Sequence, residues 1–322
     1  MFTVADIRKY LSEDDKILGK LDACFSNICE TADVNAESLD LIHPKFKDPL
    51  GYIDKSLAKV IIAPLSIEGK LRGISPDKTI ILSKEPKLLF AKIADDLFVV
   101  QASAGIHPTA YIHPQAILGK NVHIGAFCFI DKCEIGDGCV IHSHVSIEDG
   151  TVIGNNVTIK SGARIGQQGS GYVKNENGEY INFPQIGTVI IEDNVVIGSN
   201  SSIDGGALKF TKIGRGTKID NQVQVAHNVL IGENCIITAS VCIGGSCEIG
   251  NNVWIGLSAS IKNKVKIGDG AFISMGSVVI RDLEAGASVI GNPAEDTMDF
   301  VKKERFIEKM MNSEALADIV KE

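Results

Sequence analysis

A branched aliphatic side chain recurs at every sixth position over much of this chain. The longest uninterrupted run covers positions 213–279, and shorter runs cover positions 135–165 and 191–203. Positions 106–130 repeat with the same period, one residue out of phase with the run that follows. A period of six matches neither the helical repeat of about 3.6 residues nor the simple alternation of a strand. It fits a short strand that ends in a turn, and glycine often follows the repeated isoleucine.

Three such units close one triangular coil, and stacked coils bury the repeated side chains in a continuous core. Neighbouring coils then lie about 4.8 Å apart, which is the spacing of paired strands. The sequence therefore predicts a mainly β protein, a left-handed parallel β-helix of hexapeptide repeats. The left hand is a property of hexapeptide-repeat proteins and does not follow from the period itself.

The remaining segments lack this period. Before the repeats, "TVADIRKYL" has the pattern of a short amphipathic helix, and "AKVIIAP", "TIILS" and "DLFVVQA" have the pattern of short strands. We therefore expect an N-terminal α/β domain over residues 1–103 and the β-helix over residues 104–294. Polar turn residues predict an extruded loop at 166–185 within the β-helix. Residues 295–322 have the pattern of a C-terminal helix.

Composition and charge narrow the functional classes. The 322 residues are 44% hydrophobic and 22% charged, which is typical of a folded protein. A net charge of −8 argues against nucleic acid as a partner, because phosphate binding needs a basic face. We expect no transmembrane segment, no secretory signal and a cytoplasmic location, because no apolar stretch has the required length. The eight cysteines contain no CxxC pair and are expected to act as small apolar side chains.

One histidine falls outside the buried positions of the repeat. In "DNQVQVAHNVLIG" the register turns Val225 inward and places His227 at an outward-facing corner. One coil later the same corner holds Gly245, and the next coil brings Asn263 with Lys264 beside it. A neutral imidazole can take a proton from an attacking group, and an exposed glycine N–H can stabilise an oxyanion. The corner therefore predicts acyl transfer, with His227 as general base and Gly245 as oxyanion donor.

Longer motifs resemble a known family. The repeats, "FPQIGTVIIEDNVVIG" after the loop, "SSIDGGAL" and above all "IDNQVQVAHNVLIG" are similar to the UDP-3-O-(3-hydroxyacyl)glucosamine N-acyltransferases of lipid A biosynthesis. The resemblance runs from about residue 30 to 295 and is strongest over 183–256. It implies a homotrimer with active sites between neighbouring β-helices and a UDP-amino sugar as acceptor. The implied donor is a 3-hydroxyacyl chain on the 4'-phosphopantetheine of acyl carrier protein, and no bound cofactor is expected.

The resemblance also implies roles for individual residues. The family histidine at the position of His227 is the general base, and Asp220 in the same motif could orient its ring. Asp40, His43 and Phe46 fall where the family usually has Phe, Asn and Tyr around the uracil.

Two further sites follow from the same resemblance. Asn263 and Lys264 are expected to contact substrate, although Lys264 replaces a second family histidine. Carrier docking is expected at a basic set in the last coil and the terminal helix, namely Arg281, Lys302, Lys303 and Arg305. The alternative for the helix residues is an ordinary solvated face, on which Glu304 and Glu308 pair with the basic side chains.

Two other functions remain open from the sequence. One is a coenzyme-A-dependent sugar acetyltransferase on the same fold. The other is a non-catalytic or zinc-dependent β-helix trimer, in which histidines of the early coils would hold the metal. No metal site is expected from their spacing; these histidines are His107, His113, His123, His142 and His144.

Overall fold

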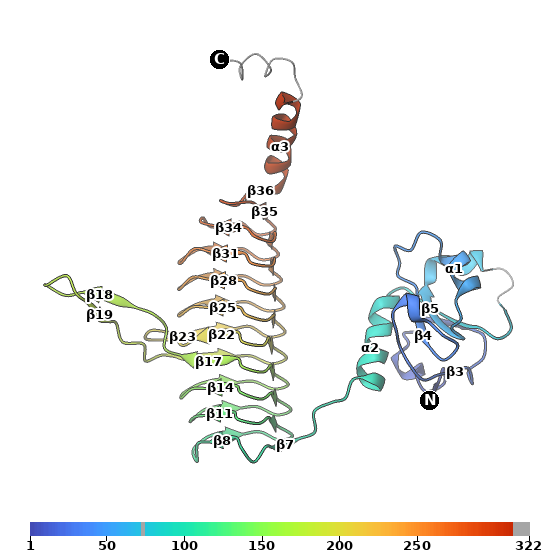
Figure 1. Cartoon of the computed structure of the whole chain (residues 1–322), viewed down its shortest axis with the longest axis horizontal. Coiled ribbons are helices and arrows are strands. Elements are labelled where there is room, and N and C mark those ends of the chain that lie inside the picture. Colours follow the sequence, from blue (N-terminus) through green and yellow to red (C-terminus); the bar gives the residue numbers. More distant parts are fainter. Residues whose placement is uncertain (72–74, 312–322) are drawn as a thin grey trace. The chain divides into compact units, whose positions relative to one another are not determined.

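The computed structural model describes residues 1–71 and 75–311, and the chain divides into two compact units between Gln101 and Ala102. Figure 1 shows the element order and the stacked coils of the second unit. No helix in these described ranges is long and apolar enough to cross a membrane.

The N-terminal unit is built on a four-stranded mixed sheet. Its strand order is β2 (Lys16–Leu18), β6 (Thr79–Ser83), β5 (Val60–Pro64) and β4 (Leu39–Leu41), with only the β2–β6 pair antiparallel. A separate pair joins β1 (Phe2–Thr3) to β3 (Cys24–Phe25). Alternate side chains of β5 enter two different hydrophobic clusters, because successive strand residues face opposite sides of the sheet. Helix α2 (Pro86–Phe98) contributes to one cluster and α1 (Pro49–Lys55) to the other.

Two of the predicted elements in this unit are wrong. "TVADIRKYL" forms a turn and a single 3-10 helix at Arg8–Tyr10, because the Asp6 carboxylate accepts hydrogen bonds from the Thr3 N–H and hydroxyl. Such side-chain bonds to the local backbone compete with helix formation. The first residues of "DLFVVQA" belong to helix α2 instead of a strand, because Leu89 and Ile93 bury one helical face and the helix continues to Phe98.

The second unit is a parallel β-helix, so the prediction of a left-handed β-helix of hexapeptide repeats is confirmed. Its strands form three parallel sheets, here numbered I to III, and each strand pairs with the strand one coil away. Sheet I contains β7 (Gly105–Ile106), β10 (His123–Ile124), β13 (Val140–Ile141), β16 (Thr158–Ile159), β21 (Val196–Ile197), β24 (Lys218–Ile219), β27 (Ile236–Ile237), β30 (Trp254–Ile255), β33 (Phe272–Ile273), β35 (Ser288–Ile290) and the antiparallel β36 (Glu295–Asp296). Sheet II contains β8 (Tyr111–Ile112), β11 (Phe129–Ile130), β14 (Ser146–Ile147), β17 (Arg164–Gln167), β22 (Ser202–Asp204), β25 (Gln224–Val225), β28 (Cys242–Ile243), β31 (Ser260–Ile261) and β34 (Val278–Val279). Sheet III contains β9 (Ile117–Leu118), β12 (Glu134–Ile135), β15 (Val152–Ile153), β20 (Thr188–Ile191), β23 (Phe210–Ile213), β26 (Leu230–Ile231), β29 (Glu248–Ile249) and β32 (Lys266–Ile267).

The repeated side chains form the core of this unit. Ile219 pairs with Ile237, Ile237 with Ile255 and Ile255 with Ile273, and all four are buried. Burial of one such side chain stabilises the fold by about 1.5–3 kcal/mol, so the repeat itself drives the stacking. Five of the eight cysteines lie in the same core, in agreement with a role as apolar filler; they are Cys128, Cys133, Cys139, Cys235 and Cys247.

Two insertions interrupt the coils on the same side. The first lies between β17 and β20 and carries a projecting hairpin of β18 (Tyr172–Lys174) and β19 (Tyr180–Asn182), seen in Figure 1. The second lies between β22 and β23. Regular coils pair residues 18 positions apart, such as Ile219 and Ile237, whereas Ile203 pairs with Val225, which is 22 positions away. Both insertions border the corner that holds His227.

The chain continues from the last coil into α3 (Thr297–Met311), which contacts β35 and β36. The predicted C-terminal helix over 295–322 therefore has its described part at 297–311, and positions 312–322 lie outside the described residues.

Candidate active site at a corner of the β-helix

His227 lies in the turn that follows β25, at the corner between sheets II and III. Val225 pairs with Ile243 and Ile243 with Ile261, so the corner stacks His227, Gly245 and Asn263 on successive coils. A Cβ atom placed on Gly245 would lie 2.8 Å from both Cε1 and Nε2 of the His227 ring. Only glycine at position 245 therefore leaves room for the imidazole. The Gly245 N–H makes no hydrogen bond within the described chain, so it is available to a ligand.

A second glycine, Gly169, packs against the other side of the His227 ring. A Cβ on Gly169, at the base of the first insertion, would lie 2.9 Å from His227 Cβ and 3.2 Å from Cδ2. The imidazole is thus held between two backbone segments without side chains. Sequence reasoning missed Gly169, although its place within "GSG" after a turn-rich stretch signalled a close backbone approach.

The Nδ1 atom of His227 faces the side chain of Asn228. The Asn228 Oδ1 accepts a hydrogen bond of 2.8 Å from the Ala207 N–H, which leaves the Nδ2 amide 3.2 Å from Nδ1 of the ring. An amide nitrogen only donates, so in this arrangement Nδ1 accepts and the neutral ring carries its proton on Nε2. Within one chain Asp220, which the motif suggested as an orienting partner, does not lie at the His227 corner, because it follows β24 at a different corner and is exposed.

A carboxylate lies on the coil adjacent to His227. Asp204 ends β22, and because Ile203 pairs with Val225 it lies one coil from Ala226. Gln224 Nε2 donates to Asp204 Oδ2 at 2.9 Å, and Ser202 Oγ donates to Oδ1 at 3.4 Å. Burial raises the pKa of Asp204, and these hydrogen bonds and the nearby His227 oppose that rise. The sequence contained Asp204 within "SSIDGGAL", but the second insertion hid its register relative to His227.

An apolar pocket of about 430 Å³ opens beside Asn228. The second insertion supplies one wall, and Phe183 of the first insertion supplies another. Its apolar lining residues are Phe183, Ala207, Leu208, Phe210 and Leu230. Four of them are exposed large side chains, so this patch is able to bind an apolar chain.

Basic side chains follow on the coils beyond Gly245. Lys264 and Arg281 are exposed, and neither forms an ion pair within residues 1–71 and 75–311. Because Ile261 pairs with Val279, Arg281 continues the column of His227, Gly245 and Asn263. The site therefore has a carboxylate on one side of the imidazole and unpaired cations on the other.

Two of the other basic residues expected to dock a carrier form exposed ion pairs. Lys302 pairs with Asp299 and Lys303 with Glu295, each at 3.0 Å, so their partners are not the expected Glu304 and Glu308. Arg305 is exposed on the same helix.

In the N-terminal unit, the three residues expected near a uracil base differ in role. Asp40 is buried and accepts hydrogen bonds from the Tyr52 and Ser56 hydroxyls at 2.9 and 2.8 Å, so it is an internal structural carboxylate. The expectation of a substrate contact at Asp40 is therefore wrong. His43 and Phe46 are exposed in the turn after β4, and Phe46 lies 5.0 Å from the Tyr52 ring, centre to centre. Aromatic surface is thus present in this segment, at Phe46 and Tyr52.

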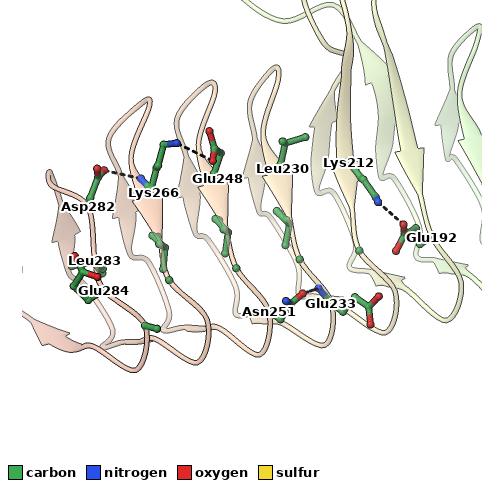
Figure 2. A pocket seen from close by; sticks show the side chains of 18 residues that line it. Glu192, Lys212, Leu230, Glu233, Glu248, Asn251, Lys266, Asp282, Leu283 and Glu284 are labelled. Atoms are coloured by element: carbon green, nitrogen blue, oxygen red, sulfur yellow. Dashed lines mark hydrogen bonds and ion pairs between the residues drawn. The ribbon is translucent and has the colours of Figure 1, made fainter.

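A larger hollow on sheet III is shown in Figure 2. It is lined by a ladder of charges that pair with one another, Lys212 with Glu192 and Lys266 with Glu248. His227 does not line it. We place the candidate site at the His227 corner, because charges already paired along a sheet leave little for a ligand.

The early-coil histidines do not form a recognisable metal cluster in the part of the chain that the structure describes. His123 and His142 are nearest, with ring centres 6.4 Å apart, and burial lowers the pKa of His142.

Comparison with known families identifies the repeats. The family model "Bacterial transferase hexapeptide (six repeats)" matches residues 210–245 and 246–281, and "Hexapeptide repeat of succinyl-transferase" matches residues 188–226. The model of the "GMPPB C-terminal domain" matches residues 94–177.

Curated relatives carry one activity name. The UDP-3-O-acylglucosamine N-acyltransferase of Coxiella burnetii is 36% identical over 57% of this chain and 59% of its own length. UDP-3-O-acylglucosamine N-acyltransferase 1 of Francisella tularensis subsp. holarctica is 37% identical over 56% of this chain and 58% of its own length. The chain is a homologue of these proteins, which confirms the resemblance seen in the motifs, and the match spans less than two thirds of their length.

Solved structures give a related but different name. The UDP-N-acetylglucosamine acyltransferase of Campylobacter jejuni matches with a TM-score of 0.54 and 28% identity, over 60% of this chain and 73% of that one. The enzyme of the same name from Francisella novicida matches with a TM-score of 0.55 and 25% identity, over 62% and 73%. The acceptor in these names has its amine already acetylated, whereas the sequence relatives acylate an amine. Identity is higher to these N-acyltransferases, at 36–37%, than to the two solved structures, at 25–28%.

Proposed function

We propose that this protein is an N-acyltransferase of lipid A biosynthesis, which moves a 3-hydroxyacyl chain from acyl carrier protein to the amine of a UDP-3-O-acylglucosamine. The observation that carries the proposal is the His227 imidazole stacked on Gly245, whose N–H is free, beside an apolar pocket. The named relatives supply the class of acceptor. The cytoplasmic location expected from the sequence is part of the proposal.

The reaction uses the corner as follows. The acceptor amine attacks the thioester carbonyl, and His227 takes one proton from its nitrogen as the C–N bond forms. The Gly245 N–H donates to the oxyanion of the tetrahedral intermediate. When the C–S bond breaks, its electron pair stays on sulfur, and the imidazolium returns the proton to give the free thiol of 4'-phosphopantetheine. No other cofactor is needed.

The base role requires a change at Asn228. A free Nε2 lone pair needs the proton on Nδ1, where it would face the Asn228 amide nitrogen at 3.2 Å. The proposal therefore includes release of the Asn228 hydrogen bond when substrate binds, at a cost of about 1 kcal/mol for a neutral pair.

The partners follow the charge along the corner. The anionic phosphopantetheine arm fits the side of Lys264 and Arg281, with Asn263 between them, and the acyl chain fits the apolar pocket. We propose that the carrier docks mainly through Arg281 and Arg305, because Lys302 and Lys303 are already paired. His43, Phe46 and Tyr52 would hold the uracil. A homotrimer, with a neighbouring β-helix closing each site, completes the proposal.

A matrix of donors and acceptors tests this function. Thiol release and product mass are measured with 3-hydroxyacyl carrier protein or acetyl-coenzyme A as donor. The acceptor is UDP-3-O-acylglucosamine or UDP-N-acetylglucosamine. We expect efficient transfer only for the first donor with the first acceptor. Preference for acetyl-coenzyme A, or for the acetylated acceptor, would contradict the proposal and favour the sugar acetyltransferase or O-acylation.

A further inference from the structure

The Asp204 carboxylate has no ion-pair partner in the described ranges, and the basic group near it is His227. The two hydrogen-bond donors to Asp204, Gln224 and Ser202, are neutral. The side chain is partly buried, so an ionised carboxylate here is held in one orientation at an electrostatic cost. A cation supplied from outside would offset that cost.

The position of Asp204 indicates which kind of cation would bind there. The residue lies one coil from Ala226, next to His227, on the side opposite Lys264 and Arg281. Asp204 is itself only partly buried, whereas Gly205 and Gly206 after it are buried against backbone, so a ligand can reach this segment at the Asp204 side chain. An acceptor amine that is about to meet His227 is an ammonium ion near neutral pH, as amines generally are.

From this geometry we propose that Asp204 binds the ammonium group of the acceptor, and so selects an amine over a hydroxyl as the group that is acylated. This inference rests on the proposed function. A carboxylate and an ammonium form a short charge-assisted hydrogen bond, whereas a hydroxyl offers the same carboxylate only a neutral donor. Formation of the amide from an ammonium releases two protons. One is taken up by the thiol and the other passes to solvent, so Asp204 acts as a binding residue and ends the cycle unchanged.

The chain contains a matched control for this carboxylate. Glu148, on an earlier coil of the same sheet, receives hydrogen bonds from Gln167 and Ser146 in the same pattern. Both carboxylates are therefore held by a glutamine and a serine, but only Asp204 lies on the coil next to His227. Glu148→Gln removes an equivalent charge away from the site.

The test measures binding without the donor. Calorimetry gives the Kd of UDP-3-O-acylglucosamine and of UDP-3-O-acylglucose, which has a hydroxyl in place of the amine. We expect the parent protein and Glu148→Gln to prefer the amine about 10-fold or more, and Asp204→Asn to lose that preference, since a charge-assisted bond is replaced by a neutral one. Equal preference in Asp204→Asn and the parent would overturn the inference.

A second measurement needs no variant. In the parent protein at pH 9.5 the ligand amine is neutral, so the preference should fall toward one, and a preference that persists there would also overturn the inference. Thermal unfolding of Asp204→Asn checks that the variant is folded. Failure of the proposed function looks different, because the parent would then transfer no acyl chain to the amine acceptor whatever its binding preference.

Discussion

Replacement of Gly245 by alanine should reduce acyl transfer by about 100-fold or more. The new Cβ would lie 2.8 Å from Cε1 and Nε2 of His227 and 3.3 Å from Nδ1. Carbon contacts are normally about 3.5–4.0 Å, so the ring must move by roughly 1 Å. A misplacement of this size costs about 100-fold in rate, which corresponds to about 2.7 kcal/mol in the barrier.

The same substitution should leave the β-helix folded. Gly245 does not have the left-handed backbone that would penalise a side chain. The equivalent turn position one strand earlier is Ala239, which follows the inward Ile237 as Gly245 follows Ile243, so this type of turn accommodates a methyl group. The inward Ile243 and its stacked neighbours are untouched.

The assay is thiol release from the acyl-carrier donor at saturating acceptor, with the midpoint of thermal unfolding measured on the same samples. The double variant with His227→Ala tests whether Gly245→Ala acts by displacing the imidazole. If it does, Gly245→Ala should cause little further loss of rate in a protein that already lacks the imidazole. Gly245→Ala with parental turnover would refute the reasoning. A double variant much slower than His227→Ala alone would show that Gly245 acts independently of the ring.

Three further changes test the neighbouring assignments. His227→Ala should lower kcat by about 10²–10⁴ with an unchanged unfolding midpoint, and near-normal turnover would exclude it as the base. Asn228→Asp should keep or raise kcat and move the acidic limb of the pH–rate profile to higher pH. One carboxylate oxygen can accept from the Ala207 N–H, and the other can accept from a protonated Nδ1 and so raise the pKa of the ring. A large fall in kcat would indicate that His227 acts as an Nε2–H donor. Reversal of Lys302, Lys303 and Arg305 to Glu should raise the KM for the carrier donor at low salt and raise it less at high salt. The effect should be modest, because two of the three charges are paired. Donor kinetics identical to those of the parent protein across the salt series would place docking elsewhere.

The column at the corner was predictable because a β-helix converts spacing in sequence directly into position in space. Once Ile243 is inward, the register fixes Gly245 as the neighbour of His227 on the next coil, and the pairing of Val225 with Ile243 agrees. No long-range information beyond the period was needed. The same property explains why Asp220 of the same chain does not lie beside the ring, since its distance in sequence from His227 places it at another corner of the coil.

Residues outside the period could not be placed in this way. Gly169 meets His227, and Ala207 meets Asn228, through the two insertions, whose lengths are not multiples of the repeat. The presence of the second insertion could be inferred from the sequence, because Ile203 and Ile213 are separated by more than one six-residue repeat. In the N-terminal unit, burial of Asp40 depends on hydroxyl donors from α1 and the residue that follows it, which local pattern does not reveal.

The insertions also explain why the candidate site lies at His227 although every coil has three outward corners. A bare hexapeptide corner offers small turn residues, little apolar surface and no depth. Here the first insertion brings Gly169 against the ring, and the second turns Ala207 to fix Asn228 and adds Leu208 to the apolar wall. Removal of both insertions would leave the His227–Gly245 stack in place, because that stack depends only on the coil register. It would remove the Ala207 N–H that holds Asn228 and the pocket residues Phe183 and Leu208, so under the proposed function the repeat supplies the catalytic pair and the insertions supply its selectivity.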